Sequence, residues 1–274
     1  CAFYIRRNYF CMNRFEFSYP PSCPSCELGF KQYHESDFYS IRYIQAKLVI
    51  LSLERNDGYI CARKFYPDRF LFDKEKEIIM QLKWHPNILN CFGYIDDDPS
   101  TSPSLLFEFA ANSSLDNFFE SGKTIDDTTK SRMLYQILGA LDYLHMNGII
   151  HQDLVPENIF VTADYKIYIG HFWRSRIYLE QDKFDSPQGF SFNDDLALYG
   201  FLIYEIANMK LFWDRKEYPN ITAGQRIDFV FQNKMPCLPA ELGSIVELYE
   251  KCVRNDLSNR LSTFIYLYQF SNYY

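Results

Sequence analysis

The sequence predicts an α+β fold, with a small sheet-rich lobe followed by a larger helical lobe. Residues 38–65 are rich in Ile, Val, Leu and Tyr and are interrupted by the turn-forming Asn56-Asp57-Gly58, as expected for paired strands. After Ser114 the spacing of apolar residues becomes helical. With 47% hydrophobic and 23% charged residues over a length of 274, the chain can bury a core in each lobe.

The pattern divides the chain into three predicted parts. Residues 1–37 mix prolines and cysteines without a sustained period, which indicates an N-terminal arm. Residues 38–111 are expected to form the sheet-rich N-lobe, and residues 112–274 the helical C-lobe.

Local signals predict the elements within these lobes. Asp126-Asp127 can cap a long helix whose apolar stripe ends at Asn147-Gly148. A helix with charges between its apolar positions is expected to stop at His85-Pro86-Asn87. The other predicted elements are helices over 70–83, 193–208 and 242–254, and strands near 88–95 and 105–109.

Charge and cysteine usage exclude several functions. The formal net charge of -7 argues against nucleic-acid binding, which needs a basic surface. Of eight cysteines, only Cys23 and Cys26 form a CxxC, and no second pair follows at zinc-finger spacing. We therefore expect free thiols in a reducing compartment.

The first residues leave two interpretations open. The apolar Cys1–Ile5 followed by Arg6-Arg7 matches the last turn of a membrane helix with its basic cytoplasmic flank, and an arbitrary chain boundary is the alternative. The sequence itself has no apolar run of the roughly 20 residues that a membrane span needs. We expect a cytoplasmic location, with the arm juxtamembrane and membrane contact only through a segment preceding Cys1, if the first interpretation holds.

The segment His151–Asn158 (HQDLVPEN) carries the chemistry expected of this chain. A carboxylate and an amide five residues apart on a loop can serve phosphoryl transfer. Asp153 would orient and deprotonate a hydroxyl, and the Asn158 oxygen would coordinate a cation. Alone, this spacing is also compatible with a capped turn.

This segment is similar to the catalytic loop of eukaryotic protein kinases, and further motifs of that family follow its order and spacing. Ala62-Arg63-Lys64 resembles the strand lysine motif, with Glu75 as the ion-pair partner and Glu77 as the second candidate. The other matching segments are His85–Ile88, the hinge Leu106–Ala110, Asn193–Gly200 with Asp195 as anchor of the catalytic loop, and Cys252–Arg260. The resemblance covers residues 38–270 and implies a bilobal protein-kinase-like fold.

The resemblance also implies nucleotide-binding residues. Lys64, paired with Glu75, would hold the α- and β-phosphates. The implied adenine shell and hinge consist of Val49, Ala62, Phe107 as gatekeeper, Glu108, Ala110 and Phe160. The branch stays open, because Pro156-Glu157-Asn158 is of the serine/threonine style whereas the hinge and the terminal helices resemble tyrosine-kinase-like domains.

The chain departs from the family's pattern where phosphate and metal should bind. His171 occupies the place of the metal-binding Asp, and an imidazole is a poor ligand for magnesium. The phosphate-binding glycines are replaced at positions near Arg42, Ile44 and Lys47. Two further departures are Gln152 in place of the catalytic-loop Arg, and Ser186-Pro187-Gln188 in place of A-P-E, whose Gln188 could not form an ion pair with Arg260.

These departures predict a catalytically inactive pseudokinase that acts as a signalling scaffold or allosteric partner. We expect protein partners, such as an active kinase or a receptor subunit, and no metal site. Because Lys64, Glu75, Asp153 and Asn158 persist, weak ATP binding stays open beside a purely structural role for these groups. The alternatives are an active atypical kinase that transfers phosphate from ATP to protein Ser, Thr or Tyr, and a small-molecule phosphotransferase.

Overall fold

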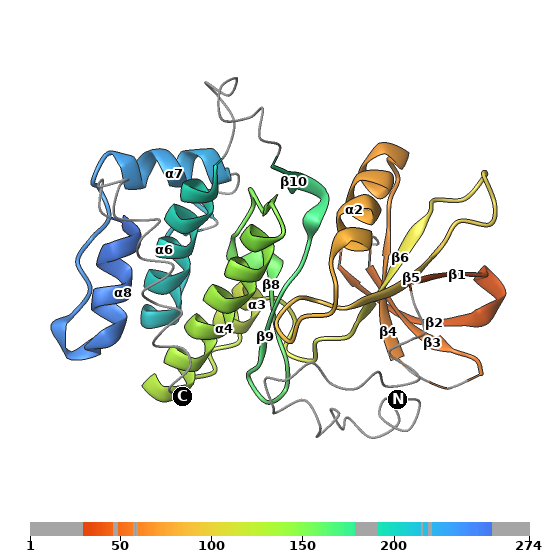
Figure 1. Cartoon of the computed structure of the whole chain (residues 1–274). Helices are drawn as coiled ribbons and strands as arrows, with labels where there is room; N and C mark the ends of the chain where they lie inside the picture. The colour runs from red at the N-terminus through yellow and green to blue at the C-terminus, as the bar shows by residue number, and fades with distance from the viewer. Residues whose placement is uncertain are drawn as a thin grey trace. The chain divides into compact units, whose positions relative to one another are not determined.

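The computed structural model describes residues 30–45, 49–56, 58, 60–178, 191–214, 216–218 and 221–253. The chain forms two compact units (Figure 1), of which the first contains residues up to Gln81 together with Leu89–Phe109. The second contains Leu82–Ile88 and the chain from Ala110 onward. The first unit is a sheet with one long helix and the second is mainly helical, so the predicted α+β class is confirmed.

A six-stranded sheet organises the first unit, in the order β1-β5-β6-β4-β3-β2. Neighbouring strands are antiparallel except for β1, which pairs parallel with β5. The strands are β1 (Lys31–Tyr33), β2 (Phe38–Gln45), β3 (Val49–Glu54), β4 (Ile60–Phe65), β5 (Cys91–Ile95) and β6 (Ser104–Glu108).

Strand β1 lies within the segment that the sequence indicated as an arm, so the sheet begins earlier in the chain than Phe38. Three residues are too short for an alternating pattern to identify a strand. By contrast, the turn at Asn56-Asp57-Gly58 does join two antiparallel strands, β3 and β4, and Gly58 has a φ of 68° that suits glycine.

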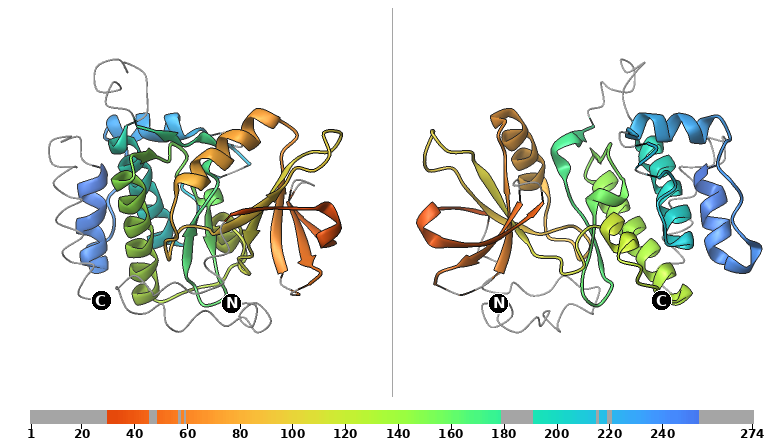
Figure 2. Two further views of the ribbon diagram at one scale, coloured as in Figure 1. Left: turned by 45° about the vertical axis from the view of Figure 1, so that its right-hand side comes forward. Right: turned by 180° about the vertical axis from the view of Figure 1, so that it is seen from behind.

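The long helix of the first unit is α2 (Arg69–Gln81), close to the predicted range 70–83 (Figure 2). It buries Phe72, Glu75, Ile78 and Ile79, residues that recur at the i, i+3, i+4 and i+7 spacing of one helical face. Three of them are apolar, and Glu75 is a buried carboxylate that needs compensating partners.

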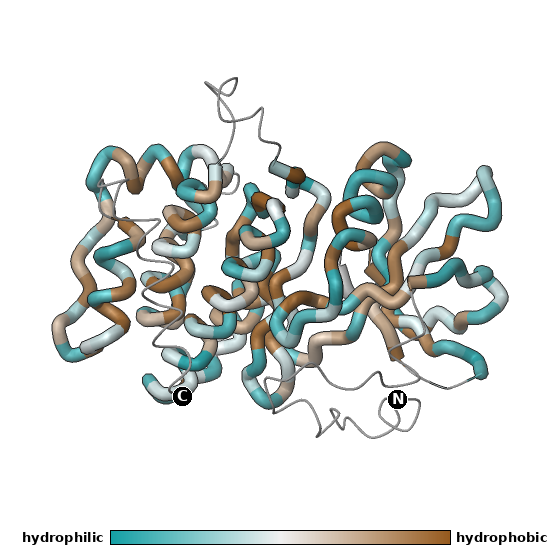
Figure 3. The backbone as a smooth tube through the Cα atoms, viewed as in Figure 1, coloured by the Kyte–Doolittle hydropathy of each residue, from teal (hydrophilic) through white to brown (hydrophobic). Residues whose placement is uncertain are grey.

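The second unit is built around two long helices, α4 (Asp127–Met146) and α6 (Phe192–Asn208). The Asp126 carboxylate caps α4 by accepting from the Thr129 backbone N–H at 2.7 Å, as the sequence predicts. Figure 3 shows apolar and polar residues alternating along these helices, in agreement with one buried face each. The remaining helices are α3 (Leu115–Glu120), α7 (Ala223–Phe231) and α8 (Ser244–Val253).

Short strands and turns of the second unit hold its functional loops. The strands form two small antiparallel ladders, β7 with β10 and β8 with β9. These elements are β7 (Ile149–Ile150), η3 (Pro156–Asn158), β8 (Ile159–Val161), β9 (Ile167–Ile169), η4 (Phe172–Arg174) and β10 (Arg176–Ile177).

The turn at His85 predicts a pH-dependent contribution to stability. The His85 ring stacks on Tyr143 at 4.7 Å, and its Nδ1 accepts from the Asn87 backbone N–H at 3.2 Å. Burial, and then the charge of Lys166, lower the pKa of His85 from 6.5 to about 4. As the pH falls from 6.5 toward 4 the unfolded chain therefore binds a proton that the folded chain does not, and stability is lost in this window.

Urea unfolding at pH 7 and pH 5 measures this contribution. His85→Asn keeps an acceptor for the Asn87 N–H and removes the titrating ring, so the variant is expected to lose less stability on acidification than the wild type. Equal losses in both proteins would contradict the assignment.

Several sequence-based predictions lie outside the described residues. They concern Cys1–Arg7, the pair Cys23 and Cys26, Lys47, Ser186–Gln188 and the segment from Arg254 onward that includes Arg260. Within the described ranges, Cys61, Cys91, Cys237 and Cys252 are free thiols. No helix in the same ranges has both the length and the apolar character needed to cross a bilayer.

Candidate functional site

In the first unit, Lys64 and Glu75 form the ion pair that the sequence predicts. Strand β4 carries Lys64 and helix α2 carries Glu75, and the Lys64 Nζ lies 2.7 Å from the Glu75 Oε2. The Glu75 side chain is fully buried, whereas Lys64 retains 20% exposure. A buried carboxylate is stable only when it is paired, so this contact fixes α2 against β4.

Tyr66 is a functional residue that the sequence analysis missed. Its hydroxyl donates to the same Glu75 Oε2 at 2.7 Å. Burial, and then the negative charge of Glu75, hold the pKa of Tyr66 well above its usual value, so the hydroxyl remains a donor. The signal was present, because a residue two positions after Lys64 in extended chain lies on the same face.

The other predicted nucleotide-binding residues of the first unit lie on adjacent strands. Val49 is paired with Lys64 across the β3–β4 ladder, and Ala62 is paired with Phe107 across the β4–β6 ladder. Phe107 is buried, and the Glu108 backbone N–H donates to the Asn90 carbonyl at 2.9 Å. Strand pairing thus brings these predicted residues together within this unit.

Two predicted residues belong to the second unit. Ala110 is buried and its carbonyl accepts from the Ser113 backbone N–H at 3.1 Å. Phe160 is half-buried on β8, opposite Tyr168 of β9. The structure describes each of them within the second unit alone.

The catalytic-type loop of the second unit is held by Asp195, as predicted. The two carboxylate oxygens of this fully buried residue of α6 accept from the backbone N–H groups of His151 and Gln152, both at 2.8 Å. His145 of α4 adds a third contact, Nε2 to Oδ2 at 2.9 Å, which sequence reasoning missed. Gln152 has a φ of 66°, an uncommon conformation for a residue with a side chain, and Asp195 holds it there.

Asp153 and Asn158 lie together at the end of this loop. The Asn158 amide nitrogen donates to the Asp153 backbone oxygen at 2.7 Å and to its Oδ2 at 3.0 Å. Both donations use the Asn158 –NH₂ group, so its amide oxygen faces away from these acceptors. The pair therefore has the orientation that the predicted roles require.

A cation from the same unit also approaches Asp153. The Arg174 Nε lies 3.7 Å from the Asp153 Oδ2, and the Arg174 guanidinium is 4.5 Å from the centre of the Trp173 ring. With its amide oriented to satisfy both neighbours, Gln152 donates to the Arg174 carbonyl at 2.7 Å and accepts from the Arg176 Nε at 3.0 Å. Arg174 thus places a positive charge beside the carboxylate that would act as base.

His171 occupies the predicted metal position with a left-handed backbone. Its φ and ψ are 70° and 61°, and the preceding Gly170 N–H donates to the Asn158 carbonyl at 3.1 Å. Asp, Asn and His are the side chains with Cβ that tolerate this conformation best. The backbone therefore suits a carboxylate, but the residue present supplies an imidazole, whose ring centre is 6.0 Å from that of Trp173.

These groups do not fit a magnesium ion. Magnesium needs an octahedral set of hard oxygen ligands, and this loop offers one amide oxygen, an imidazole, and a carboxylate already in contact with Arg174 and Asn158. Across the residues that the structure describes, no three His, Cys, Asp or Glu side chains are grouped as a metal site.

The packing of His151 resembles that of a structural core residue. Its ring lies edge-on to Phe172 with centres 5.4 Å apart, and its Nε2 contacts the Gly170 carbonyl at 3.1 Å. The Ser175 hydroxyl donates to the His151 carbonyl at 3.1 Å. These contacts hold the segment around His171 in place independently of any ligand.

A strand-borne lysine paired with a helical glutamate, and an Asp-x4-Asn loop held by a buried Asp, define the class of kinase-like folds. Comparison with known families agrees, since the model of the protein kinase domain matches residues 48–269. This chain belongs to the protein kinase family.

Curated kinases show the same relationship. An Aurora kinase of Saccharomyces cerevisiae is 36% identical over 126 residues, covering 43% of this chain and 34% of that protein. The serine/threonine-protein kinase PKH2 of the same yeast is 26% identical over 215 residues (69% and 19%), and human calcium/calmodulin-dependent protein kinase type 1B is 31% identical over 163 residues (53% and 46%). The chain thus spans less than half the length of each.

Proposed function

We propose that this chain acts as a pseudokinase domain, which keeps the kinase fold, binds protein partners and does not transfer phosphate. The observation that carries the proposal is His171, an imidazole on a backbone that would accept a carboxylate. Without that carboxylate, the charge of the two terminal phosphates of ATP lacks its principal compensation. Removing one such electrostatic contact typically costs about 10²–10³ in rate.

Arg174 supports the proposal from the side of the base. A positive charge beside Asp153 favours the ionised carboxylate and makes it a weaker proton acceptor. The pair Lys64–Glu75 is compatible with the same conclusion, because Tyr66 and Lys64 satisfy Glu75 without any nucleotide. The retained groups would then act as structural hydrogen-bonding partners.

The proposal includes a setting for this activity. A domain that does not catalyse would act through its surface, and we propose an active kinase or a receptor subunit as partner, in a cytoplasmic location. The curated relatives named above include a serine/threonine-protein kinase, which favours the serine/threonine branch for the lineage of this chain.

An active atypical kinase is the second candidate. The geometry of Lys64 with Glu75, and of Asn158 with Asp153, favours it, because both contacts are made at 2.7–3.0 Å. Asp153 would then act as base and Asn158 as metal ligand, with phosphate passing from ATP to a Ser, Thr or Tyr of a protein.

Thermal unfolding with ATP, in the presence and absence of magnesium or manganese, separates the two candidates. A pseudokinase is expected to show no metal-dependent rise in Tm and no autophosphorylation. A ligand at about 100 times its Kd would stabilise the chain by about 2.7 kcal/mol, which the measurement detects easily. Metal-dependent stabilisation together with phosphate transfer that Asp153→Asn abolishes would overturn the proposal.

A further inference from the structure

The residues Lys31–Asp37, here called the N-terminal strap, are docked on the edge of the first unit's sheet. They precede the range 48–269 that matches the kinase family. The strap consists of strand β1 and the single turn η2 (Glu35–Asp37), which leads directly into β2. Its contacts have the form of a peptide bound to a sheet edge.

The backbone of the strap adds a parallel strand to β5. Lys31, Gln32 and Tyr33 are paired with Gly93, Tyr94 and Ile95, respectively. A Cβ atom at Gly93 would collide with the Lys31 carbonyl oxygen and would lie 2.6 Å from the Cε2 of Tyr33. The absence of a side chain at Gly93 is therefore what allows the strap to approach this edge.

An aromatic side chain anchors the strap in an apolar cluster. Tyr33 packs against buried residues of β2, β4, β5 and β6, and meets Phe38 and Phe92 edge-on with ring centres 5.5 and 6.2 Å apart. The ring of Phe30, just before the strap, stacks on Tyr94 at 5.4 Å. Aromatic anchors of this kind dominate the energy of many peptide interfaces.

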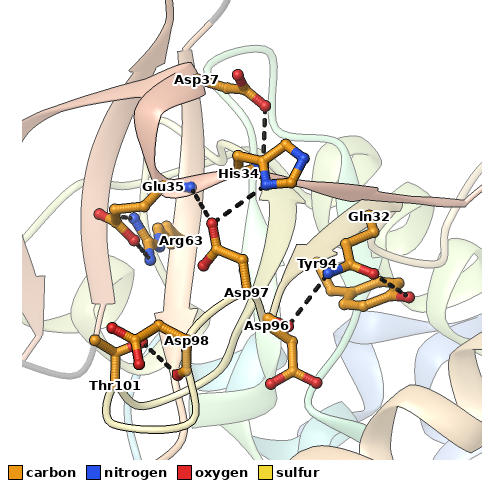
Figure 4. Close-up of polar contacts among 10 residues, drawn as sticks. All are labelled: Gln32, His34, Glu35, Asp37, Arg63, Tyr94, Asp96, Asp97, Asp98 and Thr101. Atoms are coloured by element: carbon orange, nitrogen blue, oxygen red, sulfur yellow. Dashed lines mark hydrogen bonds and ion pairs between the residues drawn. The ribbon is translucent and has the colours of Figure 1, made fainter.

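A carboxylate of the strap neutralises a buried cation of the sheet (Figure 4). Arg63 of β4 is 2% exposed, and its Nη1 donates to the Glu35 Oε1 at 2.7 Å while its Nη2 contacts the Glu35 Oε2. The Arg63 Nε donates to the Ser104 hydroxyl at 2.8 Å. Glu35 itself is 62% exposed, so the fork-shaped cation belongs to the sheet and its partner comes from the strap.

Further polar contacts of the strap involve the β5–β6 turn. The Asp97 carboxylate accepts from the Glu35 backbone N–H at 3.0 Å and lies 3.4 Å from the His34 Nδ1 (Figure 4). The Gln32 amide donates to the Asp96 carbonyl at 3.2 Å. Glycine, apolar cluster, cation and carboxylate thus meet the strap at four consecutive points.

We propose that the β5 edge is a peptide-docking site, with the strap as its resident ligand in cis. The site selects an extended segment in parallel register, with an aromatic residue at the position of Tyr33 and a carboxylate two residues later. Strand addition supplies affinity through the backbone, and the aromatic cluster and Arg63 supply specificity. This inference is independent of the pseudokinase proposal, because it invokes neither nucleotide nor phosphate.

The test empties the site in cis and refills it in trans. The double variant Tyr33→Ala, Glu35→Ala weakens the strap and leaves Gly93 and Arg63 unchanged. The probe is a fluorescent peptide with the sequence of residues 30–37 (FKQYHESD), and its binding is followed by anisotropy. We expect saturable binding to the double variant, at least about tenfold tighter than to the wild type, whose own strap competes.

Two matched controls define the site. A peptide carrying Glu35→Gln is expected to bind about tenfold more weakly, since it loses a charge-assisted contact with Arg63. Adding Gly93→Ala to the double variant is expected to abolish binding of the original peptide by steric exclusion. Absence of saturable binding, or binding that ignores both changes, would overturn the proposal.

A milder background covers the case in which the double variant does not fold alone. Glu35→Gln preserves the size of the side chain and removes its charge, so the strap stays attached more weakly. The original peptide should then raise the Tm of this variant and leave that of the wild type unchanged. A peptide that raises neither Tm counts against the docking site, and a dimer of the wild type that requires Tyr33 would support it through a second copy.

Discussion

His171→Asp is expected to give the chain a magnesium-dependent affinity for ATP that the wild type lacks. The backbone at this position is already left-handed, a conformation that Asp tolerates as well as His does. The new carboxylate would follow Gly170, whose N–H is bonded to the Asn158 carbonyl, so it would join the Asn158 amide oxygen as a ligand. Two hard oxygen donors from one loop are a typical protein contribution to a magnesium site.

The change in Tm with ATP and magnesium measures this effect. At about 100 times the Kd of the nucleotide, the variant should gain about 2.7 kcal/mol of stability that disappears with EDTA. His171→Asn is the matched control, because Asn has the size of Asp and the same tolerance of the left-handed conformation but carries no charge. An equal gain in His171→Asn would show that the missing carboxylate is not the cause.

The second large effect is expected at Asp195. Asp195→Ala removes a buried carboxylate that accepts from the His151 and Gln152 backbone N–H groups and contacts His145. These donors would be left without a partner in the core, and Gln152 would lose the contacts that hold its unusual φ. We expect the free energy of unfolding to fall by about 3–5 kcal/mol, as when one partner of a buried ionic network is removed.

Equilibrium urea unfolding tests this expectation. Asp127→Ala is a suitable control, since Asp127 lies on the surface of α4 and pairs with Lys130 in an exposed i,i+3 contact. Exposed pairs of this kind contribute less than about 1 kcal/mol. A loss at Asp195 no larger than the loss at Asp127 would mean that the loop does not depend on this anchor.

The elements that were predicted well are those with a local cause. The Asp126 cap, the apolar stripe of α4 and the turn at Gly58 each depend on residues a few positions apart, and the structure shows all three. The ion pair of Lys64 with Glu75 was also predictable, because a family motif places the lysine on a strand and helical spacing places the glutamate on the following helix.

The contacts that were missed join residues that only the fold brings close. Tyr66 and His145 each add a partner to a predicted carboxylate, and neither belongs to a motif. Arg174 lies 21 positions after Asp153, and its approach depends on the turn at η4. The strap is a similar case, since Arg63 and Glu35 are separated by 28 positions.

Sequence order and spacing by themselves determined the family, the division into a sheet-rich and a helical lobe, and the replacement of the metal-binding carboxylate by His171. They could do so because strand and helix periods, turn residues and motif spacing are local properties of the chain. Tertiary structure alone decided which buried charge meets which partner: Tyr66 with Glu75, Arg174 with Asp153, and Glu35 with Arg63. The physical reason is that a buried charge must be compensated by whichever group the fold brings within hydrogen-bond or ion-pair distance, and spacing along the chain does not encode that distance.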